Sequence, residues 1–300
     1  MRDRRVVIEA ALCAFCNVAA AVVAGVTLFI LGLVAVKGMD HMSWEFLSTP
    51  PTGDMASGGI LPMINGTVML VLLMSLFTAP LGGLIALYLN EVSARGWRYH
   101  AIMSSVRSMA AIPSIVYGLF GLAFYVTVIG GGLDALFGFE ARVFQERCLL
   151  WAALTMGTLT LPTNVVAVTE ALELVPGSQR HAALCMGYTR WETIKWVVAP
   201  QAAGGMLTGL ALSISRGAGE VAPILFVGVA YYMPGFTGDP LGQFMELGYH
   251  IFVMTTQSSN VERTLPIQYA TTLALLTVTF ALNAVGQYIR WRYRLKVAPR

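Results

Sequence analysis

An arginine and a glutamate stand four residues apart in the stretch SISRGAGEVAP, inside a run that is otherwise apolar, small or hydroxylic. The run covers residues 202–230, and the two charged residues are Arg216 and Glu220. On a continuous helix this spacing places both side chains on one face about one turn apart, so the two can pair. Either charge exposed to lipid would cost roughly 2.5 to 3.5 kcal/mol. We therefore expect this face to look into protein or into a water-filled cavity.

Two roles fit such a pair. In the first, Arg216 lies on an anion pathway, because its planar and permanently charged guanidinium offers a donor fork to oxyanions while Glu220 restrains it between passages. Gly217 and Gly219 would let another backbone or an ion come close to the charges. In the second, the two residues form a buried ion pair that fixes helix packing. The residues alone leave both roles open, and their chemistry indicates only an anion.

Other polar residues within apolar stretches are weaker candidates for the same pathway. Arg107 lies about two turns inside its stretch, where it either snorkels to the membrane surface or contacts the anion. Ser114 and Tyr117 follow Pro113, which should bend their helix, and they either line a cavity or pack against neighbours. Asn164 is expected to hydrogen-bond a neighbouring helix, with substrate contact as the alternative.

The composition indicates a membrane protein. Of the 300 residues, 56% are hydrophobic and only 12% are charged, which departs strongly from an ordinary soluble domain. A helix needs roughly 20 apolar residues to cross a bilayer core of about 30 Å. We expect an all-α integral membrane protein, a single permease-like domain over residues 1–300, with six transmembrane helices. The expected spans are approximately residues 6–36, 60–89, 101–129, 149–169, 202–230 and 267–289.

Basic residues set the expected orientation. With the N-terminus in the cytoplasm, Arg95, Arg98, Arg190 and Lys195 are among many basic residues on that side, whereas few, such as Lys37, fall on the other. This bias follows the positive-inside rule, so both termini should be cytoplasmic. Because topology explains the net charge of +3, the charge does not point to nucleic acid. No grouping of ligand residues indicates a metal site.

The longest polar connection between spans covers residues 170–201 and should be cytoplasmic. It contains a helical patch from Ser178 to Met186, with Ser178 as the expected cap and Gly187 able to end the helix in a left-handed conformation. A second helix should run from Arg190 toward Pro200. Such a helix across the end of two spans suggests a docking surface, and an ordinary loop with a solvated charged face is the alternative. A further short helix, at the membrane interface, is expected within residues 241–256.

The stretch HAALCMGYTRWETIKWVVAP resembles the cytoplasmic EAA loop of ABC importer permeases. Ala182, Ala183, Gly187 and Pro200 fall at matching places, and His181 stands where that loop usually has glutamate. The resemblance implies that the 178–200 loop docks an ATPase. The residues assigned to docking are Arg180, His181, Ala182, Ala183, Gly187 and Pro200.

Three further stretches resemble the PstA-type permeases of the bacterial phosphate-specific transporter: LYLNE (87–91), AAIPSIVYGLFGLAF (110–124) and SRGAGEVAPILF (215–226). They occur in order, and the likeness extends over nearly the whole chain from the second span. Val221 follows Glu220 where a threonine is usual. The resemblance implies the type I ABC importer permease fold and inorganic phosphate as the transported anion.

The same resemblance implies the partners. These are a homologous second permease of the PstC type, two cytoplasmic ATPase subunits of the PstB type, a periplasmic phosphate-binding protein of the PstS type, and the lipid of the bacterial inner membrane. The chain has no G-x-x-x-x-G-K-[ST] motif, so we expect no cofactor here and ATP bound by the partner ATPase. It also lacks H-E-x-x-H and G-x-S-x-G, so it is not expected to be an enzyme by itself.

Two other functions remain compatible with these observations. The nearer one is a permease for another oxyanion or for a phosphonate. The other is a non-transporting membrane scaffold that senses substrate through a partner, which would explain the docking loop but would leave Arg216 and Glu220 without a task.

Overall fold

The computed structural model describes residues 2–52, 57–93, 95–139, 141–233, 235–236, 238–258 and 260–297, and this part of the chain is predominantly helical. Six of its helical stretches are long and apolar enough to cross a membrane, which confirms the expected number. The elements in chain order are α1 (Arg2–Met39), α2 (Trp44–Ser48), α3 (Leu61–Leu87), η1 (Tyr88–Val92), α4 (Trp97–Ala110), α5 (Ser114–Phe120), η2 (Gly121–Gly130), α6 (Gly131–Phe137), α7 (Leu149–Glu173), α8 (Gly177–Cys185), α9 (Arg190–Thr193), η3 (Ile194–Val198), α10 (Ala199–Ala218), η4 (Ile224–Phe226), α11 (Leu247–Thr256) and α12 (Val261–Val297).

The helix α7 forms the centre of the bundle. It packs most extensively against α3 and α10, and 67% of its most apolar stretch is buried. Small residues allow these close approaches: a Cβ added at Gly209 of α10 would lie only 2.9 Å from the Cβ of Ala167. Gly157 of α7 similarly meets the ring of Phe77 from α3. Close packing of small residues is the usual way helices associate in lipid, where little hydrophobic force acts between them.

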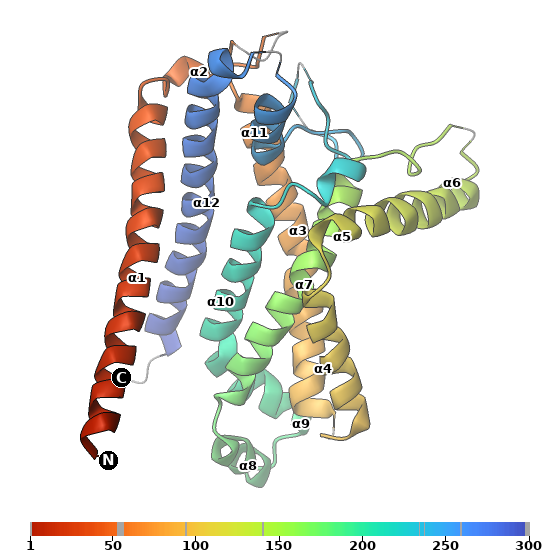
Figure 1. The fold of residues 1–300 in the computed structure, drawn as a ribbon. Coiled ribbons are helices and arrows are strands. Elements are labelled where there is room, and N and C mark those ends of the chain that lie inside the picture. Colours follow the sequence, from red (N-terminus) through yellow and green to blue (C-terminus); the bar gives the residue numbers. More distant parts are fainter. Residues whose placement is uncertain are drawn as a thin grey trace.

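The helices α1 and α12 lie together at the edge of the bundle (Figure 1). The most apolar stretch of α1 has none of its residues buried, so this helix offers its side chains to lipid or to another subunit. The start of α1, the lower part of α12 and the short helix α8 all point to the same end of the bundle (Figure 1). The two ends of the chain lie on the same side because the chain passes along the bundle an even number of times.

The third apolar stretch does not form the single helix expected over residues 101–129. The helix α4 ends at Ala110, and a new helix begins at Ser114 after a break at residues 111–113. The break has a local cause, because Pro113 has no N–H to donate and disfavours the α conformation at the residue before it. The membrane-spanning candidate is therefore Ser114–Phe137, and Figure 1 shows α5 to α6 leaving the bundle sideways.

The fifth apolar stretch also differs from the expected span of residues 202–230. The helical stretch starts earlier, at Arg190, and ends at Ala218 with Gly219 as its C-terminal cap. Residues beyond it form turns and the short 3-10 helix η4. Gly217, Gly219 and Pro223 explain the ending, since glycine and proline are the weakest helix formers. The assumption of one helix through Glu220 is wrong.

The short helix expected within residues 241–256 is α11. Glu246 begins it by accepting hydrogen bonds from the backbone N–H groups of Gly248 at 2.8 Å and Tyr249 at 2.6 Å. The backbone N–H of Leu247 donates to the hydroxyl of Thr67 in α3 at 3.1 Å. One face of α11 is buried against α12 and α3, so the helix is a packed part of the bundle.

Candidate functional site

Arg216 lies in the last turn of α10 and reaches toward α7. Its Nη1 donates a hydrogen bond to the Oγ1 of Thr163 at 3.3 Å. Its charge also acts over a longer range on Tyr117 of α5, with which it forms no hydrogen bond. The direct partner of Arg216 is thus Thr163, from a different helix.

Tyr117 holds the broken third stretch in place. Its hydroxyl donates to the backbone carbonyl oxygen of Met109 at 2.7 Å, across the interruption between α4 and α5. The ring is buried, with 5% of its surface exposed. This hydrogen bond links the position of the break to Tyr117, so a shift of either one should move the other.

Glu220 does not pair with Arg216. The salt bridges among the described residues are Arg95–Glu173 and Arg180–Glu91. Because α10 ends at Ala218, Glu220 is not on the helical face that carries Arg216, and the expected pairing is wrong. The half-buried guanidinium of Arg216 has the hydroxyl of Thr163 as its hydrogen-bond partner and no carboxylate partner among the described residues.

Arg107 and Ser114 lie on either side of the break, in the last turn of α4 and the first turn of α5. Arg107 is exposed and Ser114 half-buried, and neither has a hydrogen bond to Arg216 among the described residues. An apolar hollow of about 200 Å³ opens beside the break. It is lined by Met109, Ile112, Val116, Tyr117, Phe120 and Thr158.

Thr163 was not singled out in the sequence, although the signal was present. It follows Pro162, which lies inside α7, and a proline in a membrane helix frees a backbone carbonyl that neighbouring polar groups must satisfy. Its neighbour Asn164 is buried instead, with its side chain against the backbone of Gly82 in α3. Asn164 therefore packs between α7 and α3, but its Oδ1 has no hydrogen-bond partner among the described residues, so that atom does not form the expected hydrogen bond.

The helix expected in the long polar connection is α8. It ends in a Schellman motif: the N–H of Gly187 bonds to the carbonyl of Leu184 at 3.0 Å, and the N–H of Tyr188 bonds to that of Ala183 at 3.2 Å. Gly187 has φ +93°, as the left-handed ending requires. Ser178 does not cap the helix, because Pro176 takes that position and no side chain accepts from the first turn.

The second helix of the connection begins at Arg190, as expected, but runs on through Pro200 into α10. Thr189 caps it in a reciprocal arrangement with Glu192: the backbone N–H of Glu192 donates to the Thr189 hydroxyl at 3.2 Å, and that of Thr189 to the Glu192 carboxylate at 2.8 Å. Proline is accepted at Pro200 because it lies at the second position of α10.

The six residues assigned to docking do not share one surface. His181, Ala182 and Gly187 are exposed, Ala183 is buried, and Pro200 is half-buried at the start of α10. Arg180 turns inward and contacts Glu91 at the end of η1. Exposed apolar side chains accompany the outer residues of α8 and α9. They are Leu184, Met186, Tyr188 and Trp191.

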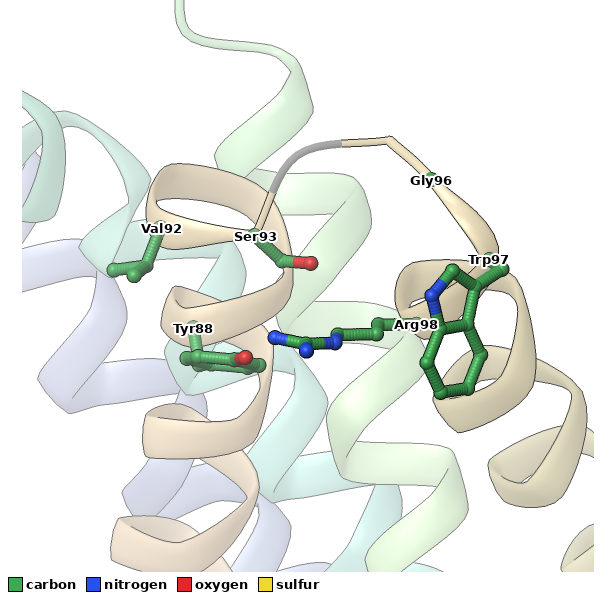
Figure 2. A pocket seen from close by; sticks show the side chains of 6 residues that line it. All are labelled: Tyr88, Val92, Ser93, Gly96, Trp97 and Arg98. Carbon is green, nitrogen blue, oxygen red and sulfur yellow. The ribbon is translucent and has the colours of Figure 1, made fainter.

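A hollow of about 300 Å³ lies between the end of η1 and the start of α4 (Figure 2). Figure 2 shows the guanidinium of Arg98 directed toward Tyr88, with Trp97 on the outer side. Arg98 also contacts the Trp97 ring, 5.7 Å from its centre. Aromatic and basic side chains together are typical of a membrane boundary.

These features define a class of protein: an integral membrane component with six apolar helices, an arginine between them and a short helix with exposed apolar side chains at one end. The family model described as "Binding-protein-dependent transport system inner membrane component" matches residues 78–295. The chain belongs to that family of ABC transporter permeases.

The chain is similar to PstA-type permeases in particular. It is 30% identical to "Phosphate transport system permease protein PstA" of Pasteurella multocida over 213 residues, which cover 69% of each protein. It is 28% identical to "Probable ABC transporter permease protein YqgI" of Bacillus subtilis over 207 residues. That match covers 69% of this chain but 66% of the relative, so the chain spans just under two thirds of it.

Solved structures share the fold. A chain of the bacterial alginate ABC transporter, solved with an alginate pentasaccharide-bound periplasmic protein, superposes with a TM-score of 0.61 at 16% identity. The match covers 91% of this chain and 93% of that chain. The protein thus has the type I ABC importer permease fold that the resemblance implied.

Proposed function

We propose that this chain is the permease subunit of an ATP-driven importer that moves inorganic phosphate across the bacterial inner membrane, with both termini in the cytoplasm. The observation that carries the proposal is the position of Arg216. It is a half-buried guanidinium between α10, α7 and α5, with hydroxyl groups of Thr163 and Tyr117 nearby. A planar cation suits an oxyanion, which accepts hydrogen bonds from the guanidinium and from the hydroxyl of Thr163, whereas the Tyr117 hydroxyl already donates its proton to Met109.

The proposed pathway runs past the break between α4 and α5. Arg107 and Ser114 border the break and can donate hydrogen bonds to the anion before or after Arg216, and Glu220, which is only an acceptor, follows the end of α10 beside the proposed path. A site on a pathway must hold its substrate weakly enough to release it. A single arginine assisted by hydroxyls meets that need better than a cluster of cations would.

The proposed partners follow from the docking surface and from the relatives. The exposed face of α8 and α9 would receive a cytoplasmic ATPase of the PstB type, with a second ATPase on a homologous permease of the PstC type. ATP would be bound by those ATPases and not by this chain. A periplasmic binding protein of the PstS type would deliver phosphate from the other side. The relatives named for phosphate transport support this substrate.

The experiment is uptake of labelled phosphate, normalised to assembled complex, in a strain without another phosphate importer. Arg216→Gln should reduce uptake by about ten- to a hundredfold, the equivalent of the roughly 1.5 to 3 kcal/mol of hydrogen bonds to a charged group. Arg216→Lys should restore little, because a point charge does not replace the planar fork. As a control, Arg95→Gln removes an arginine that is 73% exposed and should leave uptake unchanged.

Competition and exchange of charges distinguish the alternatives. If a phosphonate or another oxyanion competes more strongly than phosphate, that anion is the substrate in place of phosphate, and the transport function still holds. Exchanging the charges, with Arg216→Glu and Glu220→Arg, should leave the protein inactive, since the new arginine lies beyond the end of α10. Active exchanged protein would show that the two residues serve each other and not the anion.

A further inference from the structure

The docking helix α8 has few routes by which to pass a movement to the membrane helices. Along the chain it connects to α7 through residues 174–176 and to α9 through residues 186–189, and it packs against α9 and η3. It has no direct chain connection to α3. The side chain of Arg180 supplies a non-covalent one, because it leaves α8 and forms an ion pair with Glu91 at the end of the α3–η1 helix.

Arg180 makes four hydrogen bonds, and they reach two different helices. Its Nη2 donates to the Oε1 of Glu91 at 2.8 Å and its Nε to the Oε2 at 3.3 Å, a bidentate arrangement. Nη2 also donates to the carbonyl of Leu172 at 2.7 Å, and Nη1 donates to that of Val175 at 2.5 Å. Those carbonyls lie at the C-terminal end of α7, where a cation complements the helix dipole. One guanidinium therefore ties α8 to both α3 and α7.

The ion pair is protected from water. The side chains of Arg180 and Glu91 are 21% and 9% exposed, whereas those of the nearby pair Arg95 and Glu173 are 73% and 41% exposed. A screened pair of long side chains on the surface contributes little, but a largely shielded bidentate pair in which four of the five arginine donors are used holds a defined geometry. Of the two pairs, only Arg180–Glu91 can act as a stiff connection.

Local backbone structure presents Glu91 for this contact. The last turn of the α3 helix widens into the π-helical segment η1, in which the N–H of Ser93 bonds to the carbonyl of Tyr88 at 2.8 Å. Such turns are uncommon and often occur at functional positions. Asn90 donates to the Oε1 of Glu91 at 3.1 Å, which further orients the carboxylate.

We propose that Arg180 and Glu91 form a coupling joint that passes the movement of the docking helix α8 to α3 as well as to α7. Arg180 is then a positioning residue within the transport machinery and not a contact to the ATPase. Because α3 packs along α7 and α10, the joint lets these three helices respond as one body, and α10 carries Arg216. The inference rests on the proposed function, in which α8 receives an ATPase.

The test uses the complete complex, reconstituted in vesicles with its ATPase and its phosphate-loaded binding protein. Arg180→Lys keeps a positive charge opposite Glu91 but removes the bidentate fork and the bonds to both carbonyls. We expect this variant to retain the ATPase on purification. Stimulation of ATP hydrolysis by the binding protein, and phosphate moved per ATP, should each fall at least about tenfold, the factor that loss of one charge-assisted hydrogen bond represents.

Two further variants examine whether the residues act together. Glu91→Gln should have the same effect as Arg180→Lys, and the double variant should be no worse than either one, because both remove the same connection. Arg95→Gln breaks the exposed ion pair beside the joint and should leave stimulation unchanged. This control separates loss of the joint from a general loss of charge at this end of the bundle.

Each other outcome contradicts the proposal. A lower yield of complex with unchanged stimulation per mole of complex would show that the pair serves folding only, as would complete failure of Arg180→Lys to accumulate. An equal loss in Arg95→Gln would remove the special role of the buried pair. The docking function is tested apart from this by Met186→Asp, which alters the outer face: if that variant keeps its ATPase, the proposed docking fails, and not merely the joint.

Discussion

The backbone of Gly187 offers a measurable link between the end of α8 and the binding of the ATPase. Gly187 has φ +93°, and a Cβ added there would have nothing within 4 Å, so substitution strains the backbone without creating a clash. For Gly187→Ala this strain should be about 1 kcal/mol. If the Schellman ending must be formed for docking, the affinity for the ATPase should fall about fivefold.

Two variants make the reasoning specific. Gly187→Asn should recover most of the affinity, because asparagine accepts the left-handed conformation more readily than alanine. Gly138 is a matched control, since it also has a left-handed backbone, at φ +68°, and also has open space around its Cβ position. It ends α6, far from α8 in Figure 1, so Gly138→Ala should carry similar strain without changing the affinity for the ATPase.

The assay is titration of the ATPase onto the purified permease in vesicles, followed by its substrate-stimulated hydrolysis. Gly187→Asp, which adds a charge to the strain, should lower the affinity further and reduce transport while the protein still inserts. The reasoning is refuted if alanine and asparagine at Gly187 behave alike, or if Gly138→Ala weakens binding by the same factor.

Three other predictions concern packing, pH and topology. Gly66→Ala places a Cβ against a backbone carbonyl that precedes α11 and should destabilise the protein by about 1 to 3 kcal/mol in chemical denaturation, whereas Gly83→Ala in the same helix meets open space and should not; equal losses would refute the contact. Burial raises the pKa of Glu246 from 4.5 to about 7 and lowers that of His250 from 6.5 to about 4. Between pH 4.5 and 6.5 the native state keeps a proton on Glu246 that the unfolded state releases, which makes the free energy of unfolding fall with pH. In the same window the unfolded state binds a proton on His250 that the native state lacks, which makes the free energy of unfolding rise with pH. The two slopes, each about 1.4 kcal/mol per pH unit, oppose each other. Stability should vary little in this window, should rise with pH in Glu246→Gln and should fall with pH in His250→Gln; parallel curves for all three proteins would contradict the assignment. A cysteine at Gln179 should react with a membrane-impermeant reagent only after permeabilisation, and labelling from outside would place α8 on the wrong side.

Several properties follow from the sequence by itself. With 56% hydrophobic and 12% charged residues, the long apolar helices of this chain are stable only in a membrane. The number of spans follows from counting the apolar stretches that are long enough to cross it. The end of the docking helix is also a local property, because Gly187 is the residue best able to take the left-handed conformation there. These are short-range effects of residue type, so they can be read without knowing what else lies nearby.

The ends of the apolar helices show where the sequence alone misleads. Apolar residues continue from residue 202 to residue 230, and this continuity hid the weaker signals of Gly217, Gly219 and Pro223. Hydrophobicity reports the surroundings of a segment, whereas glycine and proline report its backbone. Once α10 ends at Ala218, the spacing of four residues no longer places Glu220 beside Arg216.

The partners of the charged residues were decided by tertiary structure. Arg216 meets Thr163, which is 53 positions away, and Arg180 meets Glu91, which is 89 positions away. Spacing along one helix predicts only neighbours three or four residues apart, because contacts between helices depend on how the helices are placed in space. The sequence determined that Arg216 lies in an apolar stretch and Arg180 in the polar connection, and the packing of α3, α7 and α10 decided which oxygen atoms each arginine contacts.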